Sequence, residues 1–172
     1  MYTHTDCPSC PHQTYHIRCD QIVAHARRDE ASAYLLISYF LSTQARTRSG
    51  DDTFWQENAT AMEYRGRGQN MLMQRLQDPR QASSDANIQA VLLLIALVSD
   101  FGDRGETRIH INGLKNMITQ RGGLSQFAHE PFLESQIREI KLSKSLHLPL
   151  ECGPDCPNTP RFSAKEQEDL TF

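Results

Sequence analysis

The chain has no excess of basic residues. Its 18 Lys and Arg are outnumbered by 21 Asp and Glu, which gives a formal net charge of −3. Binding to the phosphate backbone of a nucleic acid depends on positive charge gathered on the protein surface. The composition therefore predicts no direct DNA binding by this chain alone.

A long apolar run and a secretory leader are also missing. The longest apolar stretch, Ile88–Val98, rises about 16 Å as a helix, far short of the ~30 Å hydrocarbon core of a bilayer. The first residues, MYTHTDCPSC, are polar and contain no apolar segment before a cleavage site. We therefore expect neither a membrane span nor a signal peptide.

Sequence patterns typical of enzymes are absent. The chain contains no nucleophile elbow, no metalloprotease helix and no glycine loop of the kind that holds phosphates. Histidines lie near a Cys or a Ser in several places, but without the spacing that these catalytic patterns require. We predict that the chain is not an enzyme.

Cysteine is scarce, and the count of five is odd. In a chain without a secretory leader, such cysteines indicate free thiols or metal ligands before they indicate disulfides. Cys7 and Cys10 form a CxxC pair, and His16 and Cys19 follow closely. Thiolates and imidazole suit a tetrahedral zinc ion. These four residues are candidate zinc ligands; the alternative is a poorly ordered leader that binds no metal.

The segment from Ser83 to Leu124 begins with an almost wholly apolar helix. Every residue of Ile88–Val98 except Gln89 is apolar, so no face is left for water and the helix must be covered on all sides. Gly102 tolerates a positive φ at the turn that follows, and Asp103 is placed to cap the next helix. The pattern predicts a central helix that ends at this turn.

A second, one-sided helix follows the turn. Its apolar residues recur every three to four positions, which is the spacing of a single buried stripe. Gly122 and Gly123 then stop the helix. We expect this helix, from about Glu106 to Arg121, to pack antiparallel to the first. The stripe consists of Ile111, Leu114, Met117 and Ile118.

The rest of the chain shows a series of helix-type apolar patterns separated by polar segments. It shows no alternation of apolar and polar residues of the kind that predicts a strand. The fold class is therefore all-α, as a helical bundle or an array of helix hairpins. Further helices are expected over 20–43 and from Pro131 onward, with a loop over 46–52. The predicted organisation is a poorly ordered leader (1–19), a helical domain (20–142, core 83–124) and an irregular, Pro-containing tail (143–172).

The segment SSDANIQAVLLLIALVSDFGDRGETRIHINGLKNMITQRGGL resembles the regulatory middle region of fungal-specific transcription factors. The similarity extends over roughly Asp52–Phe162, where Tyr64–Pro79 looks like the family's preceding helix with Leu72 and Leu76 turned inward. The motif positions that carry the resemblance are Gly102, Asp103, His110, Gly113, Leu114, Met117, Arg121, Gly122 and Gly123.

The resemblance implies a nuclear protein that regulates transcription through protein interaction. Its partners would be proteins of the transcription machinery or further copies of itself, and no cofactor is implied. The family's binuclear zinc cluster needs six cysteines and a basic run, which the leader does not have. The resemblance further implies the N-terminal part of a larger helical domain, so we expect uncovered apolar stripes on Ala31–Leu41 and Phe132–Leu142.

Alternative interpretations remain at several points. The chain as a whole could be a small zinc-knuckle adaptor built on its leader, or a helical enzyme of unknown kind. His110 could pack against a facing helix or carboxylate, or contact a ligand. Arg121 could complement the dipole of its helix, or hold an effector. Gly113 is expected where a neighbouring helix approaches closely.

Overall fold

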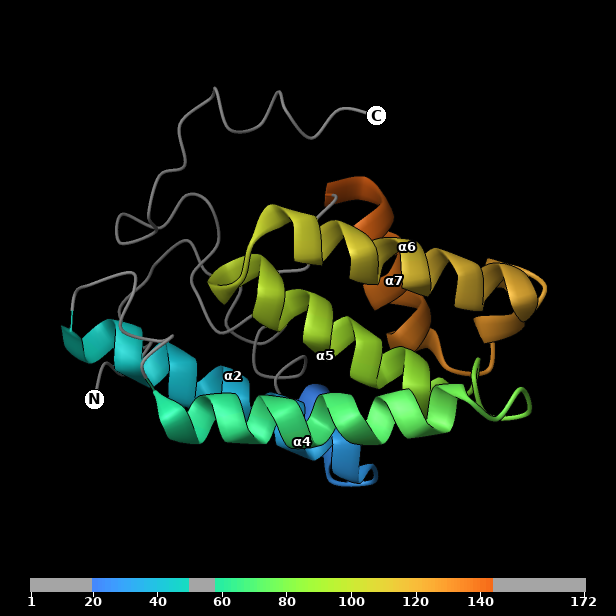
Figure 1. Cartoon of the computed structure of the whole chain (residues 1–172). Coiled ribbons are helices and arrows are strands. Elements are labelled where there is room, and N and C mark those ends of the chain that lie inside the picture. The colour runs from blue at the N-terminus through green and yellow to red at the C-terminus, as the bar shows by residue number, and fades with distance from the viewer. Residues whose placement is uncertain (1–19, 50–57, 144–172) are drawn as a thin grey trace.

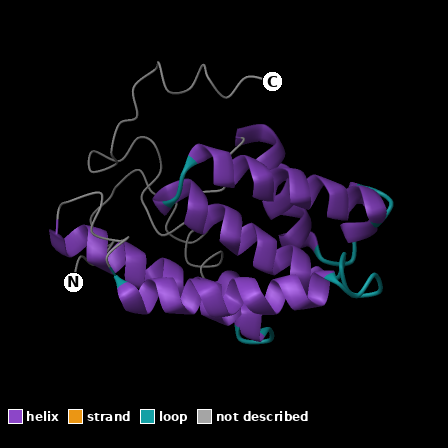
Figure 2. Cartoon of the chain, viewed as in Figure 1, coloured by secondary structure: helices purple, strands orange, loops and turns teal. Residues whose placement is uncertain are grey.

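The computed structural model describes residues 20–49 and 58–143. Within these ranges every regular element is a helix, so the all-α prediction is confirmed (Figure 2). Residues 20–26 are helical. The helices that follow are α2 (Glu30–Ser49), α4 (Ala59–Leu76), α5 (Asp85–Phe101), α6 (Arg104–Gln120), the 3-10 turn η2 (Leu124–Phe127) and α7 (Pro131–Ser143).

Helix α5 is the centre of the bundle. All residues from Ile88 to Val98 are buried, and α5 contacts α2, α4, α6 and α7. Figure 1 shows α2 and α4 side by side on one side of α5, with α6 and α7 on the other. Neither side-chain amide atom of Gln89 has a hydrogen-bond partner in the described part of the chain. The predicted central helix and its antiparallel pairing with α6 are both confirmed.

Helix α4 packs on α2 through a glycine. A Cβ added at Gly68 would lie 2.8 Å from Leu35 Cγ and 3.1 Å from the Ala31 carbonyl oxygen. The Ser38 hydroxyl also donates to the Ala61 carbonyl at 2.8 Å across this interface. The two helices approach so closely because Gly68 has no side chain.

The expected helix over 20–43 is broken in two. Asp29 accepts a hydrogen bond from the backbone N–H of Ser32 at 2.8 Å, which caps a new helix at this point. Arg75, at the end of α4, forms an ion pair with the same Asp29. Helix α2 also continues to Ser49, so the expected loop over 46–52 begins too early.

Two expectations about exposure are wrong. Leu72 is 4% exposed as predicted, but Leu76, the last residue of α4, is 39% exposed. The stripe on α7 is covered, since Leu133 and Ile137 are buried where α7 meets α5 and η2. On α2, Ile37 and Phe40 are exposed, as expected for an uncovered apolar stripe.

Candidate interaction surface

The turn between α5 and α6 has a different cause from the one predicted. Gly102 has a φ of −107°, which is open to any residue, so the expected positive φ is wrong. A Cβ at Gly102 would instead lie 2.7 Å from the carbonyl oxygen of Val98. Glycine is needed there for space. Asp103 does cap α6, accepting a hydrogen bond from the N–H of Glu106 at 2.8 Å.

The end of α6 is a double-glycine stop. Gly122 and Gly123 have φ angles of 97° and 96°. The N–H of Gly123 donates to the Ile118 carbonyl at 2.9 Å, and that of Gly122 donates to the Thr119 carbonyl at 3.0 Å. These two bonds form a Schellman motif, in which glycine satisfies the last carbonyls of a helix. The structure thus confirms the predicted stop.

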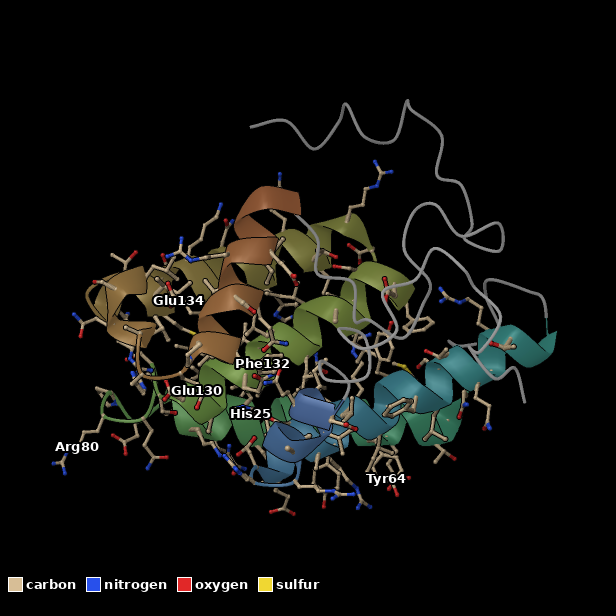
Figure 3. The ribbon with its side chains drawn as sticks, turned by 180° about the vertical axis from the view of Figure 1, so that it is seen from behind. His25, Tyr64, Arg80, Glu130, Phe132 and Glu134 are labelled. Atoms are coloured by element: carbon tan, nitrogen blue, oxygen red, sulfur yellow. The ribbon has the colours of Figure 1, made fainter. Side chains whose placement is uncertain are left out.

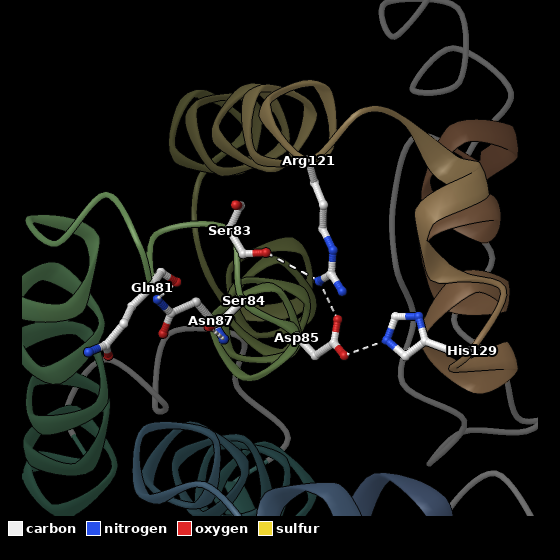
Figure 4. A network of polar contacts seen from close by, with 7 residues as sticks. All are labelled: Gln81, Ser83, Ser84, Asp85, Asn87, Arg121 and His129. Atoms are coloured by element: carbon white, nitrogen blue, oxygen red, sulfur yellow. Dashed lines mark hydrogen bonds and ion pairs between the residues drawn. The ribbon is translucent and has the colours of Figure 1, made fainter.

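Arg121 joins the end of α6 to the start of α5. Its guanidinium donates to the Ser83 carbonyl at 3.2 Å and forms an ion pair with Asp85. The other carboxylate oxygen of Asp85 lies 2.9 Å from His129 Nε2 (Figure 4). Arg121 also stacks over the Phe127 ring at 4.5 Å. We call Ser83, Asp85, Arg121 and His129 the Asp85 cluster.

The charge of Asp85 is stabilised within this cluster. Partial burial raises the pKa of the carboxyl, but hydrogen bonds from His129 and Arg121 outweigh the burial and hold the pKa below its usual value. The carboxylate therefore stays ionised at neutral pH and keeps its pairing with Arg121. From the sequence we expect Arg121 to complement the helix dipole or to hold an effector, and the ion pair with Asp85 is not predicted.

His110 lies beside a carboxylate of its own helix. Its Nε2 is 3.6 Å from Glu106 Oε1, and Glu106 also forms an ion pair with Arg65 of α4. Burial lowers the pKa of His110 below its usual value, although Glu106 acts in the opposite direction. The imidazole is therefore neutral at pH 7, beside the Glu106 carboxylate that pairs with Arg65.

This environment predicts an acid-sensitive stability. The pKa of His110 is lower in the folded chain than the ~6.5 of an unfolded one. As the pH falls below 6.5, the unfolded state binds the proton first, so the free energy of unfolding decreases until the pH passes the folded pKa. Urea denaturation between pH 7.5 and pH 5 should show this loss, and His110→Gln should reduce it. An unchanged pH slope in the variant would contradict the expectation.

Helix α6 turns one half of its surface outward. Arg108 and Lys115 are exposed there, and neither has an ion-pair partner within 20–49 and 58–143. Ile109 is 68% exposed, the highest value among the large apolar residues that the structure describes. No Asp or Glu occurs from Thr107 to His129. We call this surface the outer face of α6; it consists of Arg108, Ile109, Asn112, Gly113, Lys115, Asn116, Thr119 and Gln120.

Gly113 lies in the middle of this face. A Cβ added there would meet no atom within 4 Å, so the expected close approach of a neighbouring helix is wrong. Leu114 and Met117, in contrast, are buried on the inner side against the core. The motif positions of α6 thus divide between its inner and outer faces. In the sequence, the only sign of the outer face is the absence of Asp and Glu from 107 to 129.

A smaller contact fixes the start of α7. His25 lies 3.8 Å from the carboxylate of Glu130 and stacks against Phe132, with 5.4 Å between the ring centroids (Figure 3). The contact joins the first described helical segment to α7. Nothing in the sequence pattern signals this pairing, because the two residues belong to different helices far apart in the chain.

The described residues contain no candidate metal site. Residues 20–49 and 58–143 contain no group of three His, Cys, Asp or Glu residues that could hold a metal ion. The candidate zinc ligands Cys7, Cys10, His16 and Cys19 lie outside the described residues, so that hypothesis stays a prediction. No described helix is long and apolar enough to cross a membrane.

Comparison with known proteins gives one family. No curated protein and no solved structure matches the chain. A family model described as "Fungal specific transcription factor domain" matches residues 14–148, which include every residue that the structure describes. The match covers most of the chain and agrees with the resemblance of Ser83–Leu124. The chain therefore belongs to the fungal specific transcription factor domain family, and its role lies in the regulation of transcription.

Proposed function

We propose that the chain regulates transcription in the nucleus by binding a protein partner through the outer face of α6, and not by catalysis. The observation that carries the proposal is the exposure of Ile109 on the same helix as two exposed cations, Arg108 and Lys115, that have no ion-pair partner in the described ranges. Covering the Ile109 side chain, which is 68% exposed, would remove apolar area from water and so favour binding of a partner.

Charge indicates the chemistry of the partner. The whole chain carries a net charge of −3, but its 107–129 segment contains no acidic residue. A basic surface on an acidic protein favours an acidic partner, because complementary potentials speed the encounter and disfavour wrong partners. The rise from Arg108 to Lys115 is about 10 Å, or two helical turns. The expected partner is a short acidic protein segment with an apolar side chain for Ile109.

A reporter experiment tests the regulatory role. The chain is fused to an unrelated DNA-binding domain, and reporter expression is compared with that of the DNA-binding domain alone. We expect a change in expression that is lost in the double variant Arg108→Glu/Lys115→Glu. Arg27→Glu/Arg28→Glu is the matched control, since these two arginines are also exposed and lie on another part of the molecule.

Direct binding tests the nature of the partner. Fluorescence anisotropy is measured with a synthetic peptide of alternating Asp and Leu, with the same peptide carrying Lys for Asp, and with duplex DNA. We expect the acidic peptide alone to bind, and the charge reversal or Ile109→Ser to weaken binding about tenfold, or 1.4 kcal/mol. Tighter binding of DNA would contradict the proposal and favour a nucleic-acid contact. If Arg27→Glu/Arg28→Glu weakened binding as much as Arg108→Glu/Lys115→Glu, the peptide would not bind specifically at the outer face of α6.

A further inference from the structure

Ser83 lies in a partly exposed turn, and its hydroxyl has no hydrogen-bond partner in the described part of the chain. The residue is half-buried and lies in the turn between α4 and α5, directly before the capping residue Ser84. The Ser84 hydroxyl accepts a hydrogen bond from the N–H of Asn87 at 3.3 Å, whereas the Ser83 hydroxyl has no partner among the described residues. Ser83 is therefore the member of this pair whose oxygen is available for reaction.

Two arginines lie close to Ser83, one in space and one in the sequence. The guanidinium of Arg121 lies 3.2 Å from its carbonyl oxygen, in the Asp85 cluster (Figure 4). Arg80 precedes it by three residues, and its side chain projects outward from the edge of the molecule (Figure 3). The N-terminus of α5 adds the positive end of a helix dipole. The one carboxylate in the cluster is Asp85, which already shares Arg121.

We propose that Ser83 is a phosphorylation site and that Arg121 binds the phosphate in competition with Asp85. In the reaction, the Ser83 hydroxyl oxygen attacks the γ-phosphorus of ATP bound to a protein kinase. The new O–P bond forms as the bond to the β,γ-bridging oxygen breaks, ADP leaves, and the hydroxyl proton passes to the catalytic carboxylate of the kinase. Arg80 supplies the positive charge that an acidic substrate groove of a kinase selects.

Two other hydroxyls have the same spacing to an arginine, Ser49 after Arg46 and Thr107 after Arg104, and the contacts of Thr107 distinguish it from Ser83. Thr107 follows Arg104 by three residues, but its hydroxyl donates to the Asp103 carbonyl at 3.1 Å in the first turn of α6. The backbone of Thr107 is helical, and its oxygen is already bonded. Thr107 is thus the internal comparison for any kinase that selects arginine at this spacing.

The phosphate would change the link between α5 and α6. A phosphoserine carries a charge of about −1.5 to −2 at pH 7 and three strong acceptor oxygens. Charge-assisted hydrogen bonds from arginine to such oxygens are roughly twice as strong as those between neutral groups. Arg121 would therefore pair with the phosphate, and Asp85 would keep His129 as its partner. The proposal does not depend on the outer face of α6, because it concerns the opposite end of the α5–α6 pair from Arg108.

Mass spectrometry of the full chain, treated with ATP and a kinase that selects arginine three positions before its acceptor, tests the site. Peptide mapping assigns each phosphate, and we expect Ser83 to be phosphorylated and Thr107 not; Ser49, which follows Arg46 by three residues, is mapped separately. Arg80→Ala should slow the reaction about tenfold, equivalent to 1.4 kcal/mol of transition-state binding. Arg80 is exposed and outside the Asp85 cluster, so this variant keeps the fold. A phosphate on Thr107 alone, or a rate unchanged by Arg80→Ala, would overturn the assignment.

Phosphorus NMR of the phosphorylated chain tests the role of Arg121. We expect the second pKa of the Ser83 phosphate to lie below the usual value of about 6, because a cation stabilises the dianion. Arg121→Gln should return it to that value, and Asp85→Asn, which leaves Arg121 with one partner fewer, should lower it further. The same pKa in all three proteins would show that Arg121 does not bind the phosphate.

Discussion

Replacing Leu94 with Ala should lower the free energy of unfolding by about 2–5 kcal/mol, the range for a large aliphatic side chain removed from a core. Leu94 is 2% exposed in the middle of α5, which other helices surround. The cavity left behind would be lined by several helices at once, so the surroundings cannot easily collapse into it. Urea denaturation of both proteins measures the difference.

Leu76→Ala is the matched control for this change. It removes the same atoms from a leucine that is 39% exposed at the end of α4. We expect a loss of only about 0.5 kcal/mol, as for an ordinary surface substitution. A loss at Leu94 as small as that at Leu76 would mean that α5 is not the centre of the core.

Replacing Gly68 with Ala should destabilise the chain by about 1–3 kcal/mol, as is usual when an extra carbon enters a packed interface. The new Cβ would lie within 3.1 Å of both the Leu35 side chain and the Ala31 carbonyl oxygen. Relief requires α2 and α4 to separate, because one of the two obstacles is backbone. Thermal or urea unfolding gives the sign and size of the change.

Gly66→Ala, two residues earlier in α4, should act in the opposite direction. A Cβ at Gly66 meets no atom within 4 Å, so the substitution only improves helix propensity, by up to about 1 kcal/mol. The two substitutions are chemically identical and lie in the same helix. If both changed stability in the same direction, the close packing at Gly68 would not be what holds α2 against α4.

Local patterns were sufficient to predict the centre of the fold. The apolar run Ile88–Val98 requires burial wherever the other helices lie, and Asp103 can cap α6 by contacts within one turn. Gly122 and Gly123 stop α6 through bonds to residues three and five positions earlier. Each of these features depends on neighbours in sequence, so a single sequence contains the information.

Features that depend on distant residues were missed or misread. The break before α2 involves Asp29, whose partner Arg75 is 46 residues away. Gly68 and Gly113 look alike in sequence, yet one meets another helix and the other meets solvent. The Asp85–Arg121 pair spans 36 residues. Charge and glycine content are visible in the sequence, but which helix faces which is settled only by packing of the whole bundle.

The Arg121 contact has a consequence for how this segment opens. Ser83 and Arg121 are 38 residues apart and bonded, so α5 and α6 are joined at both ends, by the Gly102-Asp103 turn and by the Asp85 cluster. A hairpin tied at its open end cannot fray one residue at a time. Its amide protons should exchange as one cooperative unit, or foldon. The segment that identifies the family in sequence, Ser83–Leu124, is the same closed loop of chain.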